Sequence, residues 1–167
     1  MKRKPNTSQV IFVIYLLLLV WIVLFKTTFS YGEIRWFSGE RSVNFIPFYY
    51  GNEIRRFHRW EVLLNAAVFV PMGMYLKMFG FSAYRAVLTG CAASLVFELS
   101  QFALAAGASD ITDIITNTSG TLLGVCLYLL AVRIFSGKDR ADRIINTAAG
   151  VVICLFSVLA VILIIAN

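Results

Sequence analysis

Five stretches of the sequence are apolar over about the length that crosses a membrane as a helix, roughly 20 residues. They are residues 10–25, 60–78, 86–106, 111–132 and 144–166. Hydrophobic residues make up 59% of the chain and charged residues 14%, which is more apolar surface than the core of a soluble domain of this length needs. Because a backbone in lipid must satisfy its own hydrogen bonds, each stretch is predicted to be a helix. We therefore predict an all-α integral membrane protein, a polytopic bundle of about five transmembrane helices forming a single domain over residues 1–167.

The basic residues lie between the apolar stretches, and the net charge is +6. This placement indicates membrane topology and headgroup contacts, and it argues against nucleic acid as a partner. Fifteen Lys and Arg residues divide into nine on the side of the N-terminus (Lys2, Arg3, Lys4, Lys77, Arg85, Arg133, Lys138, Arg140, Arg143) and six on the other (Lys26, Arg35, Arg41, Arg55, Arg56, Arg59). The positive-inside rule then favours a cytoplasmic N-terminus and an outside C-terminus.

The two ends of the sequence differ from its middle. Residues 131–167 are predicted to form a cytoplasmic loop and an extra C-terminal transmembrane helix without a polar stripe. Lipid is the default neighbour of that helix, and a partner membrane protein is the alternative. Residues 27–59, between the first two helices, mix aromatic side chains with arginines, which is typical of the headgroup zone. We predict a long interfacial segment in which Arg55, Arg56 and Arg59 hold an anionic headgroup or serve as ordinary interfacial anchors.

A polar stripe is predicted on the fourth helix. Asp110, Asp113, Asn117, Gly120 and Gly124 recur at steps of three and four residues, so they share one helix face. Asp110 is best explained as a helix cap, because a carboxylate at an N-terminus accepts from backbone amides and favours the helix dipole. The two glycines are explained by close helix packing. Asp113 and Asn117 lie deeper, where function and interhelical hydrogen bonding are equally good explanations.

Further polar residues interrupt the second and third apolar stretches. Glu98 lies in the middle of its stretch with Gln101 one turn away, and Asn65 lies in the second. A carboxyl in hydrocarbon must be paired or neutral, so Glu98 is either a functional group or hydrogen-bonded to Asn65 or Asn117. With the predicted topology these residues reach the same depth on the outer side. The sequence thus predicts a polar binding cluster of Asn65, Glu98, Gln101, Asp110, Asp113 and Asn117.

Four motifs in this order resemble the VanZ-like membrane proteins. They are Asn44-Phe-Ile-Pro47-Phe48; Asn65-x-x-x-Phe69-x-Pro71-x-Gly73; Glu98-x-x-Gln101; and Asp110-x-x-Asp113-x-x-x-Asn117-x-x-Gly120-x-x-x-Gly124. The resemblance covers about residues 44–130 and implies a bacterial cell-membrane protein associated with low-level resistance to the glycopeptide teicoplanin. Many relatives carry an arginine just ahead of the first aspartate, where this sequence reads Gly107-Ala108-Ser109.

Two kinds of function fit these residues. The first is a non-catalytic envelope protein that binds an outer-leaflet amphiphile, namely a membrane lipid, a lipid-linked cell-wall precursor or a lipoglycopeptide. The second is a small intramembrane enzyme acting on a lipid headgroup, with Glu98 and Asp113 as its acid–base pair. No nucleophile beside a base and no nucleotide cradle is found, which favours the first. His58 is the only histidine, and the acidic residues lack ligand spacing, so neither a metal nor a cofactor is predicted.

Overall fold

The computed structural model describes residues 6–25, 43–48, 55–104 and 109–166, apart from the side chains at 25, 55–59, 160 and 163–166. Five helices account for nearly all of it: α1 (Thr7–Phe25), α2 (Arg55–Met78), α3 (Ala83–Ala103), α4 (Ile111–Ile134) and α5 (Lys138–Ala166). Each of the five contains a window long and apolar enough to cross a membrane. The prediction of an all-α, five-helix transmembrane protein is confirmed.

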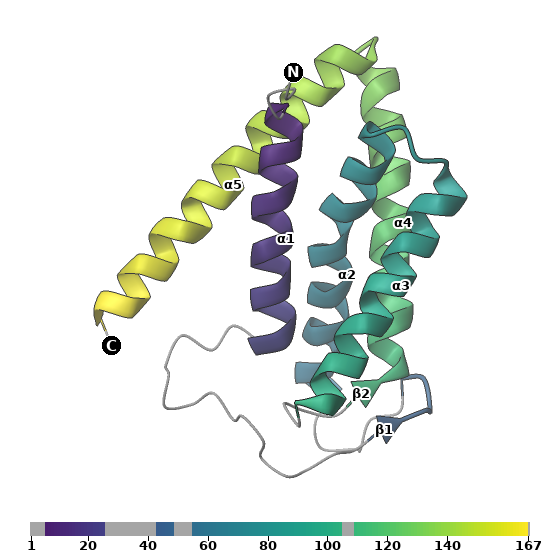
Figure 1. The fold of residues 1–167 in the computed structure, drawn as a ribbon, viewed down its shortest axis with the longest axis vertical. Helices are drawn as coiled ribbons and strands as arrows, with labels where there is room; N and C mark the ends of the chain where they lie inside the picture. The colour runs from purple at the N-terminus through teal and green to yellow at the C-terminus, as the bar shows by residue number, and fades with distance from the viewer. Residues whose placement is uncertain (1–5, 26–42, 49–54, 105–108, 167) are drawn as a thin grey trace, which may run out of the picture. The chain divides into compact units, whose positions relative to one another are not determined.

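The chain divides into two compact units. One unit spans residues 36–129 and contains α2, α3 and most of α4, with two-residue strands β1 (Val43–Asn44) and β2 (Ser109–Asp110) at one end (Figure 1). The other comprises residues 1–35 and 130–167, in which α1 and α5 are joined by a hydrogen bond of 2.8 Å from Asn146 Nδ2 to Ser8 Oγ. The first unit coincides with the motif region at about 44–130. The assignment of one domain to the whole chain stays a prediction.

Glycines bring α2 and α4 into backbone contact. A Cβ on Gly120 would overlap the carbonyl group of Ala66, and a Cβ on Gly124 would overlap that of Val70. Gly73 of α2 faces the α4 backbone in the same way. Small residues let helices approach this closely in a membrane, where packing rather than a hydrophobic driving force holds them together. The predicted packing role of Gly120 and Gly124 is confirmed, and Gly73 has the same role on α2.

Local signals set the turn between α2 and α3. Gly80 takes the left-handed conformation with φ 90°, and the amide of Phe81 donates to the carbonyl of Leu76 at 3.1 Å, which is the hydrogen bond that closes a Schellman motif. Lys77 Nζ donates to the carbonyl of Phe81 at 3.2 Å, so its charge lies at the helix C-terminus. Ser82 then caps α3 by accepting from the amide of Arg85 at 3.2 Å.

Helix ends were predicted less well than helix positions. The fifth helix begins at Lys138 rather than at residue 144, so α4 and α5 are separated only by residues 135–137 and the connecting loop is shorter than predicted. The residues added, Lys-Asp-Arg-Ala-Asp-Arg, contain neither proline nor glycine and form helix readily, so the helix extends beyond its apolar stretch. The third helix also differs from the prediction, because α3 ends at Ala103 and not at residue 106. Pro71 lies inside α2.

Candidate binding site

A short parallel bridge joins the motif segment 43–48 to the start of α4. Val43 pairs with Ser109 and Asn44 with Asp110. The Asn44 side chain makes two hydrogen bonds: its Nδ2 donates to Asp110 Oδ2 across the bridge at 3.2 Å, and its Oδ1 accepts from the amide of Ile46 in its own segment at 3.0 Å. The second bond is the side-chain to backbone contact that asparagine makes in turns. Asn44 therefore positions its own segment and holds it against α4.

Asp110 also begins α4. Its Oδ1 accepts from the amide of Thr112 at 2.7 Å, which is the contact made by an N-cap side chain with the second helical residue. Thr112, fully buried, accepts at its Oγ1 from the amide of Phe48 at 3.1 Å. Phe48 has φ 56°, a left-handed conformation that is uncommon for a non-glycine residue. The predicted capping role of Asp110 is confirmed. Its other carboxyl oxygen accepts from Asn44, so the same side chain also holds the 43–48 segment.

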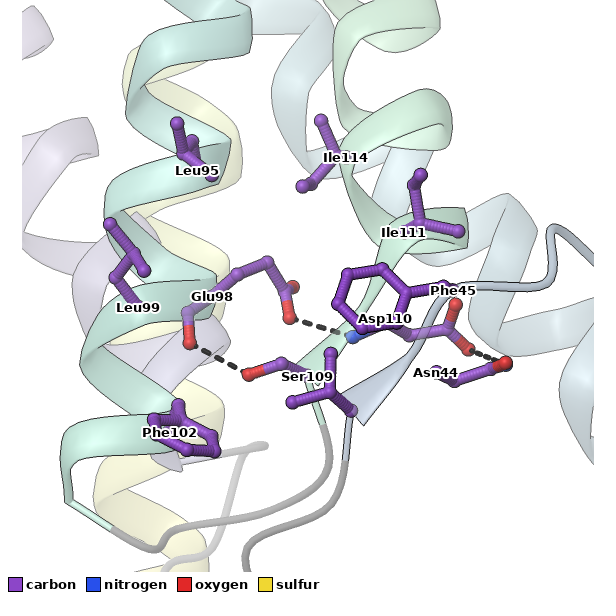
Figure 2. A pocket seen from close by; sticks show the side chains of 11 residues that line it. Asn44, Phe45, Leu95, Glu98, Leu99, Phe102, Ser109, Asp110, Ile111 and Ile114 are labelled. Atoms are coloured by element: carbon purple, nitrogen blue, oxygen red, sulfur yellow. Dashed lines mark hydrogen bonds between the residues drawn. The ribbon is translucent and has the colours of Figure 1, made fainter.

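Glu98 joins α3 to this bridge. Its Oε2 accepts from the backbone amide of Asp110 at 2.9 Å, and its carbonyl accepts from Ser109 Oγ at 2.9 Å. Only 4% of Glu98 is exposed. Figure 2 shows the carboxyl reaching from α3 to the Asp110 amide, while the Asp110 carboxyl turns toward Asn44. The expected partners Asn65 and Asn117 are instead bonded to other residues.

A second cluster lies deeper between α2, α3 and α4. Asn65 Nδ2 donates to Asp113 Oδ1 at 2.7 Å. Asn117 Nδ2 donates to Ser94 Oγ at 2.9 Å, and Ser94 Oγ approaches the carbonyl of Asp113 at 3.5 Å. Ser94 is fully buried, and the sequence analysis missed it. Its signal was its spacing, four residues before Glu98 on the same face of α3.

A groove of about 320 Å³ lies beside the bridge (Figure 2). Its exposed surface is almost entirely apolar, and the carboxyl groups of Glu98 and Asp110 beside it are hydrogen-bonded within the protein. The lining residues are Val43, Asn44, Phe45, Leu95, Glu98, Leu99, Phe102, Ser109, Asp110, Ile111 and Ile114. Leu99 is 60% exposed, so the groove opens on an outward face of α3, where a membrane protein meets lipid. Glu98 and Asp110 thus lie at the groove, whereas Asn65, Gln101, Asp113 and Asn117 do not line it.

The other residues predicted for the site lie in the helix packing or outside the described residues. Phe69 packs edge-to-face on Phe97 with ring centroids 6.2 Å apart, so its motif position is explained by packing. Gln101 is buried in α3, with 3% of its surface exposed. The side chains of Arg55, Arg56 and Arg59, in the first turns of α2, lie outside the described residues, as do Gly107 and Ala108, so the anionic headgroup site stays a prediction. Among the side chains that the structure describes, no group of three or more His, Cys, Asp or Glu residues could hold a metal ion.

Comparisons with known proteins agree with the motif resemblance. Residues 12–135 match the sequence model of a family described as VanZ/LLP1. The chain is 37% identical over 145 residues to Protein VanZ of Enterococcus faecium, a match that covers 83% of each protein. No solved structure matches the chain significantly.

Proposed function

The chain belongs to the VanZ family, and we propose that it acts in the bacterial cell envelope by binding an outer-leaflet amphiphile, thereby contributing to resistance to teicoplanin-type glycopeptides. Five membrane-spanning helices make it a multi-pass membrane protein. The observation that carries the proposal is the groove between α3, β1 and the start of α4. Its surface is almost entirely apolar, which suits the hydrocarbon part of an amphiphile.

The apolar part of the groove suits a hydrocarbon chain. Leu95 and Leu99 of α3 and Ile114 of α4 lie along it, and burying a methylene group against such side chains contributes about 0.8 kcal/mol. The volume of about 320 Å³ is at the small end of ligand pockets, roughly 300–1,000 Å³. A groove of this size holds one chain rather than a whole lipid, with the remainder of the ligand outside.

The charge beside the groove favours one kind of headgroup. The carboxyl groups of Glu98 and Asp110 lie next to its apolar surface and are hydrogen-bonded within the protein. An ionised carboxylate at this place disfavours an anionic headgroup. A pyrophosphate is anionic and only accepts hydrogen bonds, so its donors would have to come from Arg55, Arg56 and Arg59. We therefore favour an acylated glycopeptide over a lipid-linked precursor as the occupant.

The enzyme alternative has no comparable support. It requires Glu98 and Asp113 as an acid–base pair, but Glu98 lines the groove and Asp113 does not. Asp113 Oδ1 instead accepts a hydrogen bond from Asn65 at 2.7 Å. A substrate held in the groove would meet Asp110 beside Glu98, and Asp110 already caps α4.

Binding can be tested by thermal unfolding of the purified protein in detergent. We expect an acylated glycopeptide to raise the unfolding midpoint, while the same glycopeptide without its acyl chain has little effect, because a ligand that binds only the folded state stabilises it. Ile114→Trp, which fills the groove, should abolish the response. Leu122→Trp, on an exposed position of the same helix outside the groove, should keep it. A response to both glycopeptides, or its survival in Ile114→Trp, would refute chain binding in the groove.

The proposed site faces outward only if the N-terminus is cytoplasmic, as the distribution of basic residues predicts. In a background without Cys91, Cys126 and Cys154, a cysteine at Ser42 should react with an impermeant thiol reagent on intact cells. One at Ser136, in the turn between α4 and α5, should react only after the cells are opened. The reverse pattern would place the groove on the cytoplasmic side and exclude an outer-leaflet ligand.

A further inference from the structure

The turn between α4 and α5 has a defined backbone. The amide of Gly137 donates to the carbonyl of Val132 at 3.0 Å, and that of Ser136 donates to the carbonyl of Arg133 at 3.4 Å. This is the pair of bonds of a Schellman motif, with Ser136 in the left-handed conformation at φ 53°. Because residues 135–137 are the whole connection, the end of α4 and the first turns of α5 are held at a fixed distance.

A hollow of about 500 Å³ lies at this turn. Its lining combines cationic, hydroxyl and apolar side chains: Ile134, Phe135, Ser136, Arg140, Arg143 and Ile144. Arg140 and Arg143 are three residues apart and therefore share a face of α5. The neighbouring acids Asp139 and Asp142 do not line the hollow.

The two arginines have hydrogen-bond donors to offer a ligand. The bond that Arg143 makes to its own helix, to the carbonyl of Asp139 at 3.3 Å, uses only Nε. The terminal guanidinium nitrogens of each arginine carry four further N–H donors in the planar arrangement that matches phosphate oxygens. Ser136 adds a hydroxyl at the same turn. The hollow is thus a concave surface lined by both hydrogen-bond donors and apolar side chains.

We propose that this hollow binds the phosphate group of an anionic phospholipid. The apolar window of α4 ends at Ile134 and that of α5 begins at Lys138, so the turn lies where a membrane-spanning segment meets the headgroup layer. Arg140, Arg143 and Ser136 contact the phosphate, and Ile134, Phe135 and Ile144 lie along the glycerol and upper acyl chain. The apolar side distinguishes a lipid from free phosphate, which would gain nothing from those three residues.

Binding is to be measured in detergent with a fluorescent short-chain phosphatidylglycerol, the matching phosphatidylcholine and inorganic phosphate as probes. We expect phosphatidylglycerol to bind the parent at least about tenfold more tightly than either other probe, in low salt and in about 0.5 M salt. A general attraction of basic residues to anionic lipid amounts to roughly a fivefold gain per charge in low salt and disappears at the higher ionic strength. Binding that survives in high salt therefore indicates a built site.

Two double variants separate a site from surface charge. Arg140→Gln with Arg143→Gln removes both cations that line the hollow, and should weaken phosphatidylglycerol binding by about a hundredfold or more in high salt. Arg133→Gln with Lys138→Gln removes the same charge from the same turn but from outside the hollow, and should leave high-salt binding within about threefold of the parent. An unchanged unfolding midpoint in each variant shows that the fold is retained.

The remaining outcomes overturn the proposal. If both double variants lose binding equally, the attraction is a property of the basic turn as a whole. If inorganic phosphate binds as tightly as phosphatidylglycerol, the hollow is an anion site without lipid preference. If phosphatidylcholine binds equally well, the hollow does not select lipids by the charge of the headgroup. If a variant unfolds, Arg140→Lys with Arg143→Lys replaces it, because lysine keeps the charge but lacks the planar donor pair and should still bind at least tenfold more weakly.

Discussion

Replacing Gly120 by alanine is expected to destabilise the folded protein by about 3 kcal/mol or more, at the upper end of the range for overpacking. The added Cβ would overlap the carbonyl group of Ala66, which belongs to the α2 backbone and cannot change rotamer. The two helices would have to separate, and contacts on both sides of Gly120 would weaken with them. Gly124→Ala should behave alike, because its Cβ would overlap the carbonyl of Val70.

The measurement is the thermal unfolding midpoint in detergent, together with the amount of protein that reaches the membrane. Gly150→Ala is the matched control, because a Cβ built at that α5 position meets no atom within 4 Å among the described residues beyond its own helix backbone. There the change removes only backbone freedom and should stabilise the helix by roughly 0.5–1 kcal/mol. Parent-like behaviour of Gly120→Ala would mean that α2 and α4 do not meet at these glycines.

Glu98→Gln and Asp113→Asn are expected to remove glycopeptide resistance while the protein still accumulates in the membrane. Each amide keeps the shape of the carboxyl and one oxygen acceptor, so the bonds from the Asp110 amide to position 98 and from Asn65 to position 113 can persist. What is lost is the negative charge. If function needs a carboxylate at the Asp110 amide and another beside Asn65, loss of that charge should bring resistance down to that of cells without the protein.

Resistance is measured as the minimum inhibitory concentration of an acylated glycopeptide, with protein levels followed by immunoblot. Asp139→Asn is the control, since it removes an exposed carboxylate from α5, outside the unit that holds the groove. Undiminished resistance of Glu98→Gln would show that its charge has no part in function. Loss of protein from the membrane in both variants would instead make the two carboxyls structural.

Much of the fold could be predicted because its signals are periodic or set by length. The five spans followed from apolar stretches of membrane-crossing length, and the packing face of α4 followed from Gly120 and Gly124 at helical spacing. The cap at Asp110 followed from a short acidic side chain placed directly before a helix. Each of these signals lies within one segment of the sequence, so it can be recognised without knowing which other segments pack against it.

The partners of the polar side chains could not be predicted in the same way. Two-residue strands have no periodic pattern, so the sequence does not indicate that Asn44 pairs with Asp110, 66 residues away. Without that bridge, Glu98 was expected to bond Asn65 or Asn117 rather than the Asp110 amide. Ser94 was missed because serine is common in apolar helices. Its role is visible only from its hydrogen-bond partners on α4, Asn117 and Asp113.

The claim that the groove between α3, β1 and α4 holds a hydrocarbon chain is tested most directly by photocrosslinking. A glycopeptide whose acyl chain carries a diazirine is bound to the protein, irradiated, and the adducts are located by mass spectrometry. Adducts should concentrate on Leu95, Leu99 and Ile114 and disappear when unlabelled glycopeptide is added in excess. Adducts spread evenly over lipid-facing residues such as Leu122 and Leu155, and unaffected by the competitor, would contradict the account.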